Sequence, residues 1–186
     1  MRTQLLVAVT CLIGCSKPGA APETKPPAVT APARPTVPAD LAVPEDHKLA
    51  LVATARGVQI YDCVADAAGG LAWKLHAPRA DLFDQAGAKI GTHFGGVDNN
   101  LPPGPYWQAQ DGSRVHAGKP ASVPNPGAIP LLRLEAADTF GTGVFAGVSF
   151  VQRLATSGGV APAGACDGGK QTEVAYTAQY YFYTAP

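Results

Sequence analysis

The sequence lacks an excess of either charge. Its 14 Lys and Arg residues balance its 14 Asp and Glu residues, so the formal net charge at pH 7 is zero, and neither sign is gathered into a block. Proteins that bind nucleic acid or an anionic membrane surface electrostatically present a basic patch or stripe. We therefore expect no nucleic-acid partner, and no membrane attachment through basic side chains.

The sequence also lacks an apolar run long enough to cross a bilayer as a permanent helix, which needs about 20 residues. The run over residues 5–14 follows Arg2 and ends directly before Cys15, which is the layout of an export signal. The letters LIGC at residues 12–15 resemble the lipobox of bacterial lipoproteins. That resemblance implies cleavage after residue 14 and two or three acyl chains on Cys15, enough for stable anchoring. An ordinary secretory signal cut elsewhere is the alternative.

A tether is expected to follow the lipidated cysteine. Residues 15–44 are rich in Pro, Ala and Thr and contain hardly any large apolar side chain, so we predict a disordered, extended segment. Ser16, being a residue other than Asp after the cysteine, favours the outer membrane in the lipoprotein sorting pattern. Residues 45–186 have the size of one domain with one core.

Few cysteines remain once Cys15 is acylated and the signal is removed. Cys63 and Cys166 are then the two thiols left in an oxidising compartment, and we predict that they form a disulfide. The bond would close a loop of about 100 residues, for which chain-entropy theory gives about 4.7 kcal/mol. Two unpaired thiols are the alternative.

Helical periodicity is missing from the rest of the chain, whereas strand-type alternation is frequent. In the last segment Tyr176, Tyr180 and Phe182 share one face, which suits a strand with one buried side. With Gly and Pro between the segments, this pattern predicts an all-β antiparallel sandwich or barrel. The expected strands cover residues 48–56, 58–63, 71–76, 89–94, 129–134, 144–154 and 173–184.

Several motifs occur in an order that resembles the DUF3455 family of uncharacterised bacterial and fungal proteins. The resemblance implies membership over most of the domain, but no biochemical function. Residues 95–103 form an insert relative to the family pattern and are expected to lengthen a surface loop. The motifs are GVQIYDC at residues 57–63, Trp73, APRADLFD at 77–84, GTHF at 91–94, GPYWQAQDGS at 104–113, FVQRLATSGGVAP at 150–162, Cys166 and YTAQYYFY at 176–183.

One group of polar and aromatic residues is the candidate ligand or metal site. Imidazole and carboxylate groups of His93, Asp111 and His116 could supply three ligands to zinc or copper if the strands bring them together. Their spacing is not that of a specific metal motif, and the segment from Asp111 to Ser113 is also an ordinary turn. Cofactor and metal therefore remain unassigned. The candidate residues are His93, Tyr106, Trp107, Asp111, Ser113 and His116.

Motifs of catalysis are absent. No Ser lies in a G-x-S-x-G elbow, no G-x-G-x-x-G follows a strand, and nothing singles out a pair of carboxylates. Arg153 shares a strand face with Val151 and is expected either to pair with a carboxylate such as Asp111 or to be solvated. We favour a non-enzymatic envelope lipoprotein that binds a ligand, an envelope protein or a glycan, or that is structural. The alternative is a small metalloenzyme or hydrolase that uses the region from His93 to His116.

Overall fold

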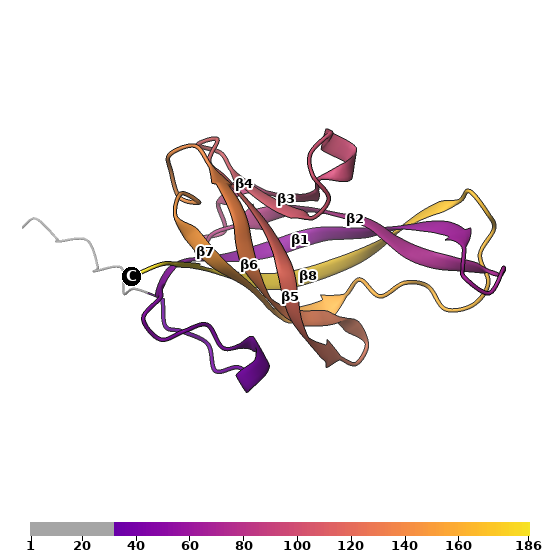
Figure 1. Ribbon diagram of the computed structural model, residues 1–186, viewed down its shortest axis with the longest axis horizontal. Helices are drawn as coiled ribbons and strands as arrows, with labels where there is room; N and C mark the ends of the chain where they lie inside the picture. The colour runs from indigo at the N-terminus through magenta and orange to yellow at the C-terminus, as the bar shows by residue number, and fades with distance from the viewer. Residues whose placement is uncertain (1–31) are drawn as a thin grey trace, which may run out of the picture. The chain divides into compact units, whose positions relative to one another are not determined.

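Eight strands close into a barrel in the computed structural model, which describes residues Pro32–Pro186. Each strand is antiparallel to its neighbours in the sequence, and β1 pairs with β8 to complete the ring (Figure 1). The predicted antiparallel β fold is confirmed, and its form is a barrel. The strands are β1 (Lys48–Ala65), β2 (Leu71–Phe83), β3 (Lys89–Gly95), β4 (Pro105–Ala109), β5 (Arg114–Asn125), β6 (Ala128–Phe140), β7 (Val148–Gly158) and β8 (Gln171–Thr184).

Helical structure within the described residues is limited to two 3-10 turns, η1 (Ala39–Leu41) and η2 (Val97–Asn99). No helix in this part of the chain is long and apolar enough to span a membrane. Residues of the barrel therefore satisfy their backbone hydrogen bonds mainly between strands.

Strand β1 is longer than the sequence pattern indicated, because it runs through Gly57 without a break. Strand β2 lies so close at this point that a Cβ on Gly57 would be 2.1 Å from the carbonyl oxygen of Arg79. The glycine that was expected to separate two strands instead permits their close pairing. Strands β4 and β5 were both missed, and turn-type residues such as Gly118 and Pro120 hid β5. Pairing with both neighbours overrides that local preference.

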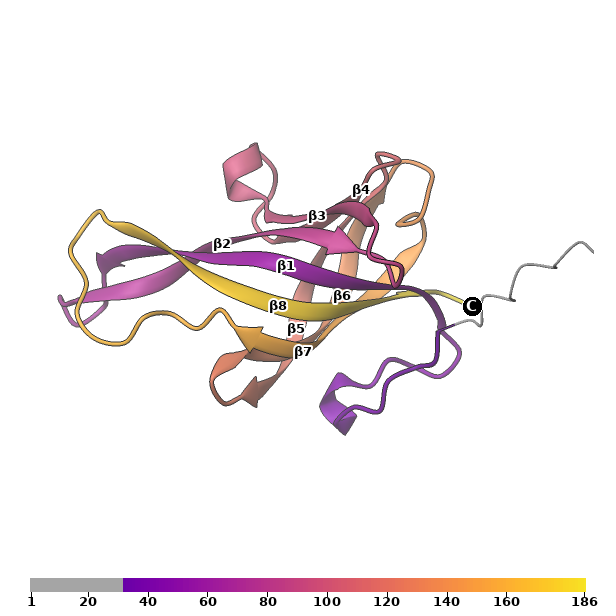
Figure 2. The same cartoon turned by 180° about the vertical axis from the view of Figure 1, so that it is seen from behind.

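Antiparallel neighbours place successive connections at alternate ends of the barrel. One end, here called the insert end, carries the β3–β4 connection with residues 95–103 and η2. The other, the turn end, carries the β4–β5 turn at Asp111 and the β6–β7 connection. Strands β1, β2 and β8 extend beyond the other strands at the insert end (Figures 1 and 2).

The interior near the turn end is filled by apolar side chains. Ala55 of β1, Leu82 of β2, Val115 of β5 and Phe182 of β8 are fully buried there. Phe145, from the β6–β7 connection, is also fully buried, and its ring centroid lies 4.7 Å from that of Phe182. This loop side chain therefore plugs the turn end.

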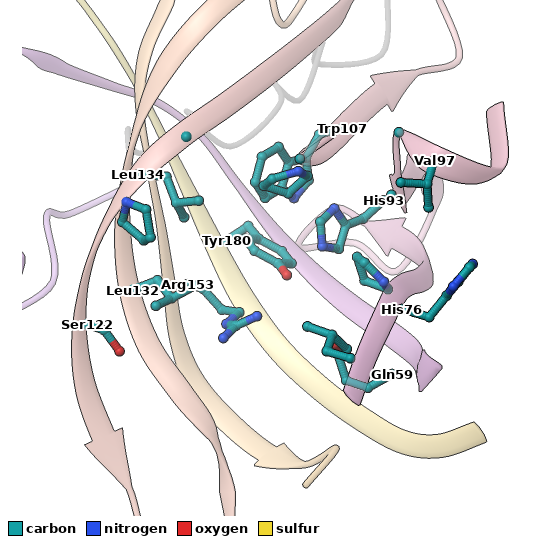
Figure 3. A pocket seen from close by; sticks show the side chains of 18 residues that line it. Gln59, His76, His93, Val97, Trp107, Ser122, Leu132, Leu134, Arg153 and Tyr180 are labelled. Atoms are coloured by element: carbon teal, nitrogen blue, oxygen red, sulfur yellow. The ribbon is translucent and has the colours of Figure 1, made fainter. Parts of the chain in front are cut away.

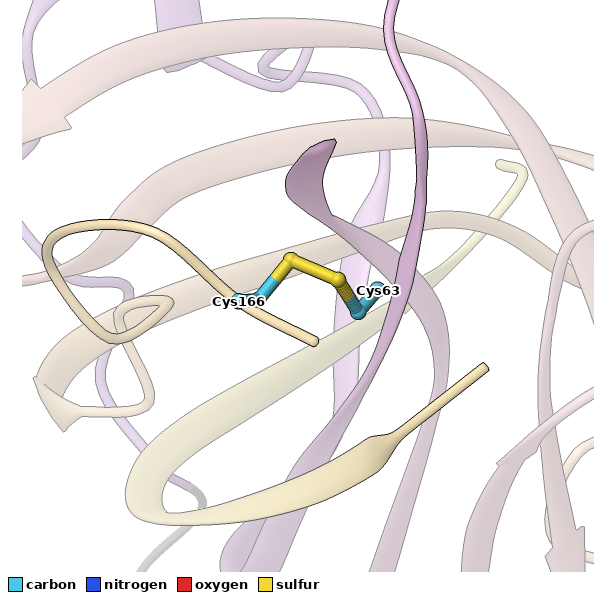
Figure 4. The surroundings of a disulfide bond; sticks show 2 residues. All are labelled: Cys63 and Cys166. Carbon is cyan, nitrogen blue, oxygen red and sulfur yellow. A yellow bond between two sulfur atoms is a disulfide. The ribbon is translucent and has the colours of Figure 1, made fainter. Parts of the chain in front are cut away.

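The predicted disulfide is present. Cys63 near the end of β1 is bonded to Cys166 in the β7–β8 connection, with their Cα atoms 5.8 Å apart (Figure 4). The backbone N–H of Cys63 also donates to the carbonyl of Lys170 over 2.8 Å. The disulfide, together with this hydrogen bond, therefore fixes the long β7–β8 connection to the extension of β1 at the insert end.

The end of the predicted tether differs from the expectation, because the structure folds it against the barrel. The amide Nε2 of Gln152 on β7 donates to the carbonyl of buried Leu41 over 2.6 Å. The guanidinium of Arg34 donates to the carbonyls of Val43 and His47 at 2.6 and 2.8 Å. Two buried apolar side chains, Leu41 and Val43, and the polar contacts to backbone carbonyls hold the segment. The proline-rich composition gave no sign of these contacts. The compact unit therefore begins at Pro32.

Candidate functional site

A cavity of about 410 Å³ lies inside the barrel at the insert end. Eight-stranded barrels are just wide enough for side chains to fill the interior or for one small ligand to fit. Here small residues in β3 and β5 leave the space that larger apolar side chains fill near the turn end. The wall includes Gln59, Leu75, His76, Pro78, His93, Gly95, Val97, Trp107, Gly118, Ser122, Leu132, Leu134, Arg153 and Tyr180 (Figure 3).

Arg153 of β7 lines this cavity. Its Nε and Nη2 atoms donate to the carbonyl oxygen of Pro130 at 3.1 and 2.9 Å. Within residues 32–186, no carboxylate oxygen lies within 4.0 Å of the Arg153 guanidinium, which is the limit for an ion pair. The expected pairing with Asp111 is therefore not formed, and the partly exposed side chain lines the cavity (Figure 3).

Three other polar groups of the wall lack hydrogen-bond partners. They are the amide nitrogen of Gln59, the indole N–H of Trp107 and the hydroxyl of Tyr180, and each of these residues is 1% exposed. A buried polar group without a partner costs about 1–3 kcal/mol. Their concentration around one space marks this part of the interior as different from an ordinary core.

His93 of β3 is one of the two predicted site residues that do line the cavity. Its Nδ1–H donates to the carbonyl of Tyr106 over 2.8 Å, and its ring stacks on Trp107 with centroids 4.5 Å apart. Burial lowers the pKa of His93 to about 3, so the imidazole is neutral at physiological pH. Because Nδ1 carries the proton of the neutral ring, Nε2 has none and can accept a hydrogen bond.

Tyr106 and His116 point to the opposite side of the sheet from Trp107 and His93. The two rings stack with centroids 4.3 Å apart, and the Tyr106 hydroxyl donates to the carbonyl of Pro102 over 3.2 Å. The insert thus covers Tyr106, which is 1% exposed. Strand alternation separates His93 from His116, although β4 joins their strands.

Asp111 and Ser113 lie at the turn end, away from the insert. The Oδ1 of Asp111 accepts hydrogen bonds from the backbone N–H and the hydroxyl of Ser113 at 2.8 and 2.5 Å. The Oδ2 accepts from the N–H of Val144 over 2.9 Å, and the Ser113 hydroxyl accepts from the N–H of Phe145 over 3.1 Å. The hydrogen bond from Ser113 lowers the pKa of Asp111 most. These two residues therefore hold the loop that carries the Phe145 plug.

The six candidate residues therefore occupy three places. His93 and Trp107 line the cavity, Tyr106 and His116 form an outer stack, and Asp111 and Ser113 secure a turn. In the described part of the chain, no three His, Cys, Asp or Glu side chains are grouped as metal ligands. No histidine hydrogen bond activates the Ser113 hydroxyl there either, so the geometry does not assemble the metal site or the hydrolytic triad that the sequence left open.

The rim of the cavity contains a histidine held between two carboxylates. The Nδ1 of His76 lies 2.7 Å from Asp62 on β1, and its Nε2 lies 2.7 Å from Asp98 in the insert. The hydrogen bond to Asp98, followed by that to Asp62, raises the pKa of His76. Val97, next to Asp98, lines the cavity. His76 thus fastens the insert beside the cavity mouth.

Sequence reasoning missed Gln59, His76 and Arg153 as site residues. Alternation along residues 144–154 placed Arg153 on the face of buried Val151, which was a usable signal, but it did not show that this face borders a cavity. The link from His76 to Asp98 joins strands and a loop that have no shared sequence pattern. These residues become a site only through the barrel.

Comparison with known proteins gives a family and no function. One family matches residues 44–184, and its description is "Protein of unknown function (DUF3455)". Searches of curated proteins and of solved structures gave no match. The resemblance seen in the motifs is therefore confirmed over nearly the whole barrel.

Proposed function

The chain belongs to the DUF3455 family, whose function is unknown, and we propose from its cavity that the barrel binds a small, largely apolar molecule. One observation carries this proposal: the cavity combines apolar walls with a few buried polar groups that have no protein partner. Its volume of about 410 Å³ falls within the range of small-molecule sites, which is roughly 300–1,000 Å³.

The apolar part of the wall would supply most of the binding free energy. Leu75 comes from β2, Val97 from the insert, and Leu132 and Leu134 from β6, and all four line the space. Burying apolar ligand surface against them contributes about 25 cal/mol per Å² before the costs of association. The polar groups would then orient the ligand, because leaving them unpaired is unfavourable.

The site of action in this proposal is the bacterial cell envelope. Cleavage before Cys15 and acylation of its thiol would attach the chain to a membrane, and Ser16 favours the outer membrane. Cys15 lies outside the described residues, so the proposal rests on the sequence pattern. Labelled palmitate should enter the wild-type protein in cells and be absent from Cys15→Ser. Equal labelling of both proteins would contradict lipid attachment at Cys15.

Binding is tested with a neutral apolar fluorophore, N-phenyl-1-naphthylamine, and a soluble chain of residues 16–186 exported without the lipid. This chain contains the whole compact unit Pro32–Pro186. Leu132→Trp should fill part of the cavity and weaken binding at least about tenfold. Leu131→Trp is the matched control, because Leu131 precedes Leu132 on β6 and does not line the cavity. Absence of binding to the wild-type chain, or equal weakening by both variants, would contradict the proposal.

A further inference from the structure

We propose that the bound molecule is an amphipathic organic monoanion, such as a monocarboxylate with an apolar chain, and that Arg153 holds its charged group. This inference rests on the proposed binding function and adds the chemical class of the ligand. It follows from the charges that face the cavity and from the kind of polar groups beside them.

The charge balance of the wall is positive. Arg153 and His76 line the cavity, His93 is neutral, and the wall includes no aspartate or glutamate. Asp62 and Asp98, which lie beside His76 at the rim, are both engaged by that histidine. Arg153 therefore carries the one permanent charge of the cavity wall.

The ionisable neighbours of Arg153 do not neutralise it. Burial raises the pKa values of Tyr61, Tyr176 and Tyr180, so these hydroxyls stay uncharged at neutral pH. His93 is neutral as well. A cation in a low-dielectric, mostly apolar space is unfavourable unless it is paired. A bound anion would provide the missing partner.

Three other residues of the wall carry hydrogen-bond donors that have no protein partner. The indole N–H of Trp107 is a donor only, and the amide of Gln59 and the hydroxyl of Tyr180 can also donate. Figure 3 shows the guanidinium of Arg153 and the hydroxyl of Tyr180 directed into the same space. Two of the guanidinium nitrogens contact one carbonyl, of Pro130, which leaves other N–H groups for a ligand.

A monoanion fits this arrangement better than a phosphate. A single arginine balances one negative charge, whereas a phosphate dianion would keep an excess charge in an apolar space. Carboxylate also matches the planar fork of a guanidinium. The apolar walls around Leu132 and Leu134 suit the hydrocarbon part of such a ligand.

The test compares octanoate with 1-octanol by calorimetric titration into wild-type residues 16–186 at about pH 7. The two ligands share the apolar chain and differ in charge. We expect octanoate to bind at least about tenfold more tightly, the effect of one charge-assisted contact. If octanoate binds no more tightly than octanol, the anion inference is overturned while cavity binding stands. If neither ligand nor the neutral fluorophore binds, the proposed function itself fails.

Variants assign the preference to Arg153. Arg153→Met keeps much of the side-chain length. In this variant octanoate and octanol should bind about equally tightly, with the octanol affinity unchanged. Arg153→Lys should retain part of the preference. Arg133→Met is the matched control, because Arg133 of β6 donates to the carbonyl of Ala42 and does not line the cavity. Full preference in Arg153→Met, or its equal loss in Arg133→Met, would overturn the assignment. The comparison of ligands on the wild-type chain holds even if a variant does not fold.

Discussion

The two ends of the barrel interior use the same strands in different ways. Near the turn end, Phe182 of β8 packs against Phe145, and the space is filled. Two residues earlier on the same face, Tyr180 of β8 and the neighbouring Arg153 of β7 line a cavity. Inward-facing residues of one strand therefore pack in the core near the turn end and line a cavity with polar groups nearer the insert end.

The difference lies in what each connecting loop supplies. The β6–β7 connection provides a buried aromatic ring, held by Asp111 and Ser113. The β3–β4 connection instead places Val97 at the edge of the cavity and is fastened through His76. One loop fills its end, and the other borders a space that a ligand can occupy. Stability and binding should therefore respond to different residues.

The largest expected effect follows removal of the plug. Phe145→Ala should lower the free energy of unfolding by about 3–5 kcal/mol, because a fully buried aromatic ring is lost and a void remains. Urea unfolding of residues 16–186 measures this loss. Fluorophore binding at the insert end should stay within about threefold of the wild-type value.

The neighbouring residue provides the control for that substitution. Val144 is 50% exposed, so Val144→Ala should change the unfolding free energy by less than about 0.5 kcal/mol. Loss of fluorophore binding in a folded Phe145→Ala protein would show that the two ends are not independent. A stability loss as small as that of Val144→Ala would contradict the role of Phe145 as a plug.

A smaller effect is expected from Ser113→Ala. The backbone N–H of Phe145 would lose its acceptor in a buried place, which costs about 1–3 kcal/mol. The pKa of Asp111 should rise, since the Ser113 hydroxyl donates to its carboxylate. Urea unfolding and NMR titration of Asp111 measure the two changes. Exposed Ser157→Ala is the control, and an unchanged Asp111 pKa in Ser113→Ala would contradict the account.

The smallest effect concerns the insert end and depends on pH. The pKa of His76 is raised in the folded protein, so its stabilisation is complete below the unfolded value of about 6.5 and is lost as pH rises through the higher folded value. The stability difference between wild type and His76→Ala should therefore shrink from pH 6 to pH 9, and stay below about 1 kcal/mol.

A second variant identifies the partner of His76. Asp98→Asn removes the carboxylate whose hydrogen bond raises the pKa of His76 most, and should reduce this pH dependence while Asp62 preserves part of it. Urea unfolding at several pH values provides the comparison. A difference that grows with pH would mean that His76 does not fasten the insert through its charged form.

Much of the fold follows from local sequence patterns. Alternation in residues 173–184 identified the buried face of β8, because successive side chains of a strand point to opposite sides whatever the strand pairs with. The pairing of Cys63 with Cys166 followed from the count of remaining thiols. Neither prediction required knowledge of which strands are neighbours.

The site required that knowledge. Asp111 and Ser113 are close to Trp107 in sequence but lie at the opposite end from the insert, because β4 carries the chain along the barrel. Arg153 meets Tyr180 because β7 pairs with β8. The sequence by itself determined the antiparallel β character of the fold, the buried face of β8 and the disulfide, which depend on local geometry and composition. Barrel closure alone decided which inward-facing side chains fill the interior and which surround a cavity, because that space is enclosed by all eight strands together.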